Sequence, residues 1–247
     1  MPGSSQSIAT PNTVLNTAVA EELRKFADVL DASKDLKADI HKLVKDTIKE
    51  HKRIIFNGNG YDPSWIKEAE KRGLSNYPNT PLALKHYLDQ KNIDLYVSNG
   101  VLSKTELASR YEVYLETYTK TVALEARTML DMAKKDIMPA VIKYSGMIAK
   151  DLKLKKDVAL GFITDYEVAL LKDVSSLSSG LYLATNELEK ALGKATKKDP
   201  YELALYHHDV VLADMAKLRD VADKLELIVG SDYWPMPDYG KLLFSVK

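Results

Sequence analysis

Cysteine is absent from the 247-residue sequence, and glycine (11) and proline (9) are few. Without cysteine, the chain can form no disulfide scaffold, zinc finger, iron–sulfur site or cysteine nucleophile. Neither charge sign is in excess, because 35 Lys and Arg residues balance 35 Asp and Glu residues. Nucleic-acid-binding proteins usually carry a basic excess, so we expect no nucleic-acid partner.

Long apolar runs are also missing, and none approaches the roughly 18 residues that a membrane-spanning helix needs. Residues 1–5 (Met-Pro-Gly-Ser-Ser) have neither the basic nor the apolar region of a secretory signal. We therefore expect a cytoplasmic protein with no membrane partner. The apolar content of 45% and the charged content of 28% are typical of a folded domain.

Apolar residues recur at spacings of three and four along most of the chain, which predicts amphipathic helices. Thr10-Pro11 predicts a cap and first residue for the first helix. Ser103 and Glu106 form a capping box, and Asp199-Pro200 predicts another start. The apolar rows are Leu15, Val19, Leu23, Phe26 and Leu30; Leu36, Ile40, Leu43 and Ile48; Leu107, Tyr111, Tyr114, Tyr118, Val122, Met129 and Ala133; Leu170, Val174, Leu177, Leu181, Ala184, Leu188 and Leu192; and Leu203, Val210, Leu218, Val221, Leu225 and Ile228.

Several residues predict where these helices stop. Pro139 lies inside a helical pattern and predicts a kink or a new start. The polar residues 153–157 predict a link between helices, and Gly193 and Gly230 predict helix ends. The aromatic tail, residues 233–240, is predicted to be non-helical and to pack back onto the body.

Residues 51–102 interrupt the regular pattern. The segment 53–56 is β-like, residues 57–60 (Asn-Gly-Asn-Gly) predict a turn, and Asn99-Gly100 ends the interruption. Two short helices are expected inside it, one from Asp62-Pro63 to Arg72 with Gly73 as its stop, and one from Thr80-Pro81 carrying Leu84 and Leu88. The predicted fold class is mainly α: long antiparallel helices forming a bundle, with an irregular insert near residues 51–102.

Chemically specific motifs are scarce. The histidines occur in no His-Glu-x-x-His pattern, and adjacent His207 and His208 would point about 100° apart on a helix. Carboxylates on the long central helix are expected to form a solvated, ion-pairing face, and Tyr111, Tyr114 and Tyr118 are expected to pack in the core. We therefore assign no catalytic, cofactor-binding or metal-ligating residue. The histidines are His41, His51, His86, His207 and His208, and the carboxylates are Glu112, Glu116, Glu125, Asp131 and Asp136.

The Asn57–Gly60 segment allows two interpretations. Gly58-Asn59-Gly60 follows an apolar stretch and precedes a helix, as in a phosphate-binding turn. However, the third glycine of a dinucleotide motif and the lysine of a P-loop are absent, and Asp62 would repel a phosphate. We favour a structural turn whose glycines have positive φ.

The sequence resembles type III glutamine synthetases, the large bacterial form, over nearly its whole length. The stretches that carry the resemblance are Met1–Asn16, which is similar to the end of that family's catalytic domain, and then His51–Tyr61, Glu68–Leu74, Ser109–Glu112, Glu125–Met132, Asp136–Ala140 and Trp234–Phe244. The resemblance implies that residues 1–30 are the C-terminal end of the catalytic domain. It also implies that residues 31–247 are the helical C-terminal domain.

The family enzyme joins ammonia to glutamate, using ATP and divalent Mg or Mn. The resemblance implies that its nucleotide, metal and phosphate-handling residues lie upstream of Met1, which matches an internal methionine. We therefore expect a truncated or split reading frame, or a fragment, that is inactive alone and binds none of these cofactors. The resemblance implies a role in structure and subunit assembly, with the rest of the catalytic domain and further copies of the chain as partners.

Two other interpretations remain open. The chain could be an independent helical protein-interaction module without ligase activity. It could also be a small anion-binding or regulatory domain that uses the Asn57–Gly60 turn.

Overall fold

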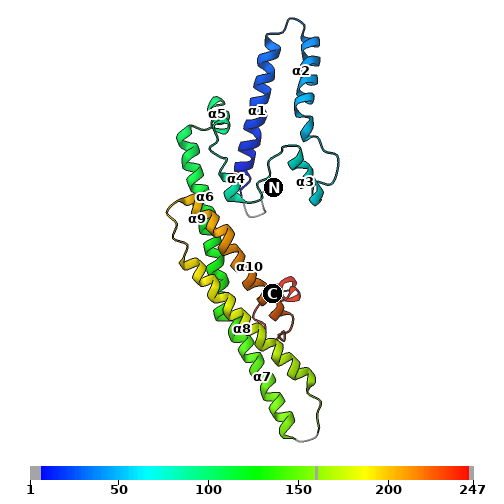
Figure 1. Ribbon diagram of the computed structural model, residues 1–247, viewed down its shortest axis with the longest axis vertical. Coiled ribbons are helices and arrows are strands. Elements are labelled where there is room, and N and C mark those ends of the chain that lie inside the picture. Colours follow the sequence, from blue (N-terminus) through cyan, green and yellow to red (C-terminus); the bar gives the residue numbers. More distant parts are fainter. Residues whose placement is uncertain (1–6, 159–160, 245–247) are drawn as a thin grey trace. The chain divides into compact units, whose positions relative to one another are not determined.

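The computed structural model describes residues 7–158 and 161–244, and the regular elements in these ranges are all helical (Figure 1). This confirms the predicted mainly α fold. The chain divides into two compact units, Met1–Tyr114 and Leu115–Lys247.

The first unit begins with a helical hairpin. α1 (Ala9–Asp31) and α2 (Leu36–His51) run antiparallel and are joined by a short turn (Figure 1). Asp35 caps α2, because its carboxylate accepts a hydrogen bond from the Ala38 N–H at 3.1 Å. The unit continues with the 3-10 turn η1 (Lys52–Ile54), α3 (Pro63–Lys71), α4 (Thr80–Leu84), α5 (Gln90–Ser98) and the first part of α6 (Lys104–Met132).

The two predicted starts of long helices in this unit have different outcomes. The capping box is confirmed, because Glu106 accepts from the Ser103 N–H at 2.8 Å and the Ser103 hydroxyl accepts from the Glu106 N–H at 3.2 Å. Thr10 was wrongly predicted to cap α1, since the helix already begins at Ala9. The Thr10 hydroxyl instead forms a hydrogen bond with the Tyr114 hydroxyl at 3.1 Å.

The insert is more helical than expected. The helix after Asp62-Pro63 is confirmed as α3, with Asp62 accepting from the Ser64 N–H at 2.8 Å. Gly73 follows with φ of 69°, as a helix stop requires. The start at Thr80-Pro81 is confirmed as α4, but Leu88 lies beyond its end. α5 was not predicted, and Gly100 follows it with φ of 64°.

The β-like segment 53–56 forms no strand. Its first residues belong to η1, and no strand occurs in the described ranges for it to pair with. The Ile55 carbonyl instead accepts a hydrogen bond from the Arg72 guanidinium at 2.9 Å. The side chain of Arg72, the residue that caps the C-terminus of α3, therefore supplies a hydrogen bond that a neighbouring strand would otherwise provide.

The Asn57–Gly60 segment bends at Gly58, and its hydrogen-bonded turn begins only at Asn59, whose carbonyl accepts from the Asp62 N–H at 3.2 Å; its glycines do not have positive φ. The Phe56 ring leaves no room for a side chain at Gly58, because a Cβ atom there would lie 2.5 Å from Cζ of Phe56. The Phe56 ring stacks on Trp65, with ring centroids 4.0 Å apart. A Cβ atom at Gly60 would meet nothing within 4 Å.

Gly58→Ala should therefore destabilise the first unit by about 1 kcal/mol, because the added methyl group displaces a ring that Trp65 holds on its other side. Gly60→Ala is the matched control and should be neutral or slightly stabilising. Urea unfolding followed by tryptophan fluorescence measures both. Equal unfolding midpoints for the two variants would contradict this explanation.

The second unit is a bundle of long helices. It contains the rest of α6, the π-helical turn η2 (Ala133–Ile137), α7 (Met138–Asp157), α8 (Asp165–Gly193), α9 (Pro200–Tyr206), the π-helical turn η3 (His207–Val211), α10 (Leu212–Glu226) and α11 (Tyr239–Leu243). α8 packs against both α7 and α10. The predicted α8 row is confirmed, since Val174, Leu181 and Leu188 are completely buried.

One row of buried residues continues from α6 through η2 into α7. We call it the long row, and its members are Val122, Ala126, Leu130, Ala133, Ile137, Val141, Tyr144, Ile148 and Leu152. Pro139 follows η2, and the backbone stays helical through Ile137 and Met138, so the disturbance predicted at this proline is a π-helical turn within a continuous helix rather than a new start. A proline ring clashes with the carbonyl four residues earlier, at Lys135, and η2 widens the helix at that residue.

Three predictions in the second unit were wrong. Residues 153–157 are the last turn of α7 rather than a link, and Lys155 and Lys156 suit a helix C-terminus. Gly230 does not end α10, which already ends at Glu226 with Leu227 as its cap; a Cβ at Gly230 would lie 3.3 Å from the Tyr144 ring. In the tail, Tyr233, Trp234 and Met236 do pack on the core as expected, but residue 239 begins α11.

Candidate interaction surface

α1 packs on the rest of its unit through a polar face. Thr10, Thr17 and Glu21 share this face, because they are spaced by seven and four residues. Thr17 is 4% exposed, and its hydroxyl donates to the Thr13 carbonyl at 2.6 Å. α1 contacts α5 within the unit. Hydroxyl and carboxylate groups are thus used where a helix normally places apolar residues.

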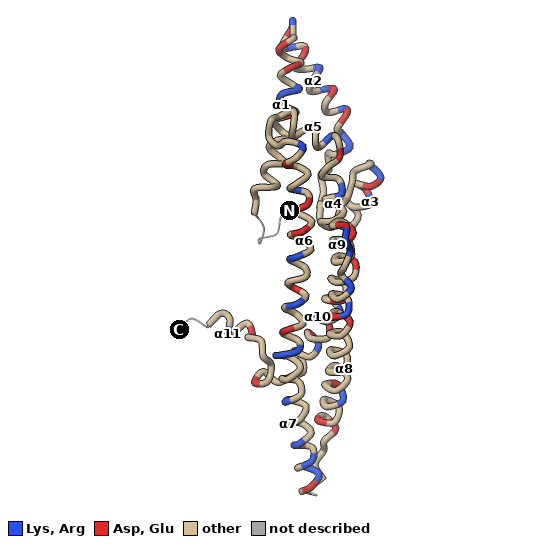
Figure 2. Tube along the Cα trace, turned by 90° about the vertical axis from the view of Figure 1, so that its left-hand side faces the viewer, with Lys and Arg blue, Asp and Glu red and all other residues tan. Residues whose placement is uncertain are grey.

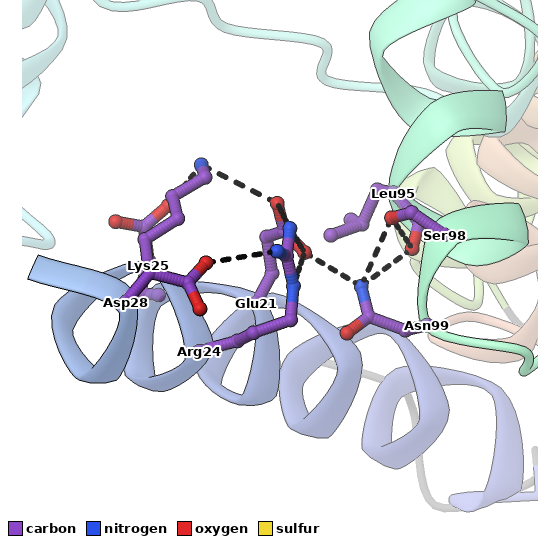
Figure 3. Close-up of polar contacts among 8 residues, drawn as sticks. Glu21, Arg24, Lys25, Asp28, Leu95, Ser98 and Asn99 are labelled. Carbon is purple, nitrogen blue, oxygen red and sulfur yellow. Dashed lines mark hydrogen bonds and ion pairs between the residues drawn. The ribbon is translucent and has the colours of Figure 1, made fainter. Parts of the chain in front are cut away.

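Figure 3 shows the main polar contact between α1 and α5. The Asn99 amide, at the C-terminus of α5, donates to Glu21 Oε2 at 2.8 Å and to the Leu95 carbonyl at 2.8 Å. Arg24 also donates to Glu21, at 2.9 Å, and bridges to Asp28 at 3.2 Å. The Asn99 hydrogen bond and then Arg24 lower the pKa of Glu21, whose side chain is only 13% exposed.

This contact should make the stability of the first unit depend on pH. Because the folded-state pKa of Glu21 lies below its ordinary value of 4.5, its charge stabilises the fold above that pH, and the contribution is lost as the pH falls through the folded pKa. Glu21→Gln should lower the melting temperature at pH 7, and the difference from wild type should close at acidic pH. Glu22→Gln is the control, since Glu22 is exposed and pairs with Lys25 on its own helix. A Glu21→Gln difference that persists unchanged at pH 3 would refute this role.

The opposite face of α1 is apolar and exposed. We call Leu15, Val19, Leu23, Phe26 and Leu30 the α1 stripe. Leu15 is 63% exposed, Val19 59% and Leu23 62%, while Phe26 and Leu30 are half-buried. The stripe predicted from the sequence therefore exists, but little of the described chain covers it.

The predicted row on α2 is exposed as well. Leu36, Ile40 and Ile48 are exposed, and Leu43 is half-buried. Figure 2 shows residues of both charge signs along α1 and α2. Rows of exposed apolar residues on a helix, with charged residues around them, are typical of a protein–protein contact.

The other residues considered from the sequence do not assemble into a site. His207 is buried and its Nδ1 lies 2.9 Å from the Leu203 carbonyl, whereas His208 lies 2.8 Å from Asp209. Among residues 7–158 and 161–244, no group of three or more His, Asp or Glu residues could hold a metal ion. The predicted carboxylate face is confirmed as exposed, with ion pairs from Glu116 to Lys120 and from Asp131 to Lys135.

The Asn57–Gly60 turn uses its polar groups internally. The Asn59 side chain accepts from the Tyr61 N–H at 3.0 Å, and Asp62 accepts from the Ser64 N–H. The Phe56 ring lies against Gly58. These contacts support the structural interpretation of this turn.

A helix able to cross a bilayer does not occur in the part of the chain that the structure describes. Comparison with known proteins gives a consistent family. Residues 39–156 match the family described as "Glutamine synthetase C-terminal domain".

Three curated relatives are glutamine synthetases. The chain is 35% identical to "Glutamine synthetase" of Butyrivibrio fibrisolvens, over 86% of this chain and 31% of the relative. It is 34% identical to "Type-3 glutamine synthetase" of Dictyostelium discoideum, over 98% of this chain and 34% of the relative. It is 31% identical to "Glutamine synthetase" of Bacteroides fragilis (strain YCH46), over 98% of this chain and 35% of the relative. The chain thus spans about a third of the length of the curated relatives it matches.

Proposed function

Because the chain carries the C-terminal domain of the glutamine synthetase family, in its type-3 form, we propose that it serves structure and subunit assembly in such an enzyme. The whole enzyme would join ammonia to glutamate in the cytoplasm, using ATP and Mg or Mn. Residues 1–30 would complete the catalytic domain, and residues 31–247 would form the helical C-terminal domain. The partners are the rest of the catalytic domain and further copies of the chain.

The observation that carries this proposal is the reversed burial of α1. Its polar face packs on the first unit, while the α1 stripe is exposed. Exposing a leucine or valine side chain costs about 1.5–3 kcal/mol relative to burying it. A covering surface is therefore expected, and the part of the relatives that this chain does not match supplies a candidate.

The experiment combines this chain with the remaining two thirds of the Butyrivibrio fibrisolvens enzyme, produced separately. The two chains should co-migrate in size-exclusion chromatography and sedimentation velocity. The double variant Leu15→Glu/Leu23→Glu should weaken the complex by a factor of about 100 or more, because it places two charges in an apolar contact. Ala20→Glu is the matched control, since Ala20 is exposed on the same helix but lies about 100° around it from Val19.

The alternative, an independent helical interaction module, uses the same exposed surface. It predicts that the chain associates with itself through the α1 stripe and does not bind the separately produced catalytic part of the enzyme. Self-association that Leu15→Glu/Leu23→Glu abolishes, with no binding to the catalytic part, would contradict our proposal and support the alternative.

A further inference from the structure

A partly enclosed hollow of about 350 Å³ lies in the first unit, between α1, α5 and the start of α6. It lies outside both the α1 stripe and the Glu21–Asn99 contact. We call it the tyrosine hollow, and it is lined by Ala9, Thr10, Thr13, Val14, Tyr87, Tyr96, Val101, Leu102, Arg110 and Tyr114. Its volume falls at the small end of the range of small-molecule sites.

Three tyrosine rings form a fixed aromatic wall. The Tyr87 ring meets the Tyr114 ring edge-on at 5.7 Å, with an interplanar angle of 89°. Tyr87 and Tyr96 lie 6.4 Å apart at 42°, and Tyr96 is 4% exposed. Such edge and tilted contacts hold the rings in place, and Tyr87 and Tyr114, which are half-buried, leave part of their apolar surface open. The hydrogen bond between Tyr114 and Thr10 joins α6 to α1 beside this wall.

Arg110 is the one charged residue among those that line the hollow. It lies four residues before Tyr114, so both side chains share a face of α6. No ion pair of Arg110 is formed within residues 7–158 and 161–244. The nearby carboxylate of Glu106 is already engaged by the Ser103 N–H and hydroxyl, each at 2.8 Å.

The hydroxyls of Tyr87 and Tyr96 stay protonated at neutral pH. Burial raises the pKa of Tyr87 to about 12, and burial also raises the pKa of Tyr96. The positive charge of Arg110, which lines the same hollow, opposes both changes. The hollow therefore combines one cation with neutral donors and an apolar wall, and no carboxylate lines it.

We propose that the tyrosine hollow binds a small organic carboxylate, with the carboxylate on Arg110 and the tyrosine hydroxyls and its flat body against the rings. Guanidinium groups bind carboxylates through paired N–H donors. Inorganic phosphate fits less well, because its second charge would meet no second cation and it has nothing to place on the aromatic wall. This site is independent of the α1 stripe and of the assembly role proposed above.

Isothermal titration calorimetry of the full chain tests the site, with benzoate as the probe and benzamide and inorganic phosphate as comparisons. Benzoate should bind, and benzamide and phosphate should bind at least about tenfold more weakly. Arg110→Gln should weaken benzoate binding by about tenfold or more, because it removes the charge that pairs with the carboxylate. Tyr96→Phe keeps the ring but loses one donor, and it should have a smaller effect.

Arg127→Gln is the matched control, because Arg127 is an exposed arginine of α6 that does not line the hollow. Circular dichroism confirms that each variant is folded. The proposal is overturned if benzoate does not bind, if benzamide binds as tightly as benzoate, or if Arg110→Gln and Arg127→Gln have the same effect.

Discussion

Leu181→Asp is expected to destabilise the helical bundle by roughly 4 kcal/mol, and so to unfold much of it at physiological temperature. Leu181 lies in the middle of α8 and is completely buried among the helices that pack on either side. An aspartate there would lose its hydration without gaining a cation or hydrogen-bond donor. It would also leave part of the leucine volume empty.

Leu183→Asp is the matched control, because Leu183 is 60% exposed two residues along the same helix. It introduces the same charge and the same loss of helix propensity without burial. Thermal and urea unfolding followed by circular dichroism at 222 nm measures both variants. Equal stability of the two variants would mean that α8 does not bury the face on which Leu181 lies.

The purified chain is expected to form no glutamine from glutamate, ammonium and ATP in the presence of Mg or Mn. Ligase chemistry needs ATP held with its metal ions and positive charge placed around the transferred phosphoryl group. The sequence has no Gly-Lys-Ser/Thr phosphate loop, and the described residues bring together no metal-binding cluster of His, Asp and Glu. On the function proposed above, these groups would lie in the part of the relatives that this chain does not match.

Phosphate release and glutamine formation, followed together, measure this outcome. The Butyrivibrio fibrisolvens enzyme, assayed in parallel, provides the positive control. Metal-dependent glutamine formation by this chain alone would reveal an active site that neither the sequence nor the fold indicates. It would also rule out a purely structural role.

The sequence predicted local features well because they depend on near neighbours. The capping box at Ser103, the Asp62 cap and the periodic row on α8 each follow from residues within one or two helical turns. The positions of the two π-helical turns were harder to predict from the sequence. Pro139 indicated a disturbance, but no comparable residue marks η3.

Tertiary features were missed because their signals are far apart in sequence. Glu21 and Asn99 are separated by 78 residues, and neither has a pattern that identifies the other. The tyrosine hollow likewise joins residues from three separate segments. The α1 stripe was predicted correctly as a pattern, but a pattern does not reveal whether the same chain covers it. Gly58 shows a related limit, since its role depends on where the Phe56 ring lies.

The spacing of residues in the long row also limits which insertions could lengthen the bundle during evolution. Its members repeat every eleven residues: Val122, Ala133 and Tyr144 form one series, and Leu130, Val141 and Leu152 another. On α8, Val174, Leu181 and Leu188 repeat every seven. An insertion of eleven residues would lengthen α6–α7 by about 16 Å and return the row to nearly the same face. In α8 an insertion of eleven residues would turn the row by only about 20°, as would one of seven, so the two facing helices could lengthen together by eleven residues. Insertions of one, two, five or six residues would turn either row away from its partner by roughly 100° or more, which makes this pair resistant to most small insertions.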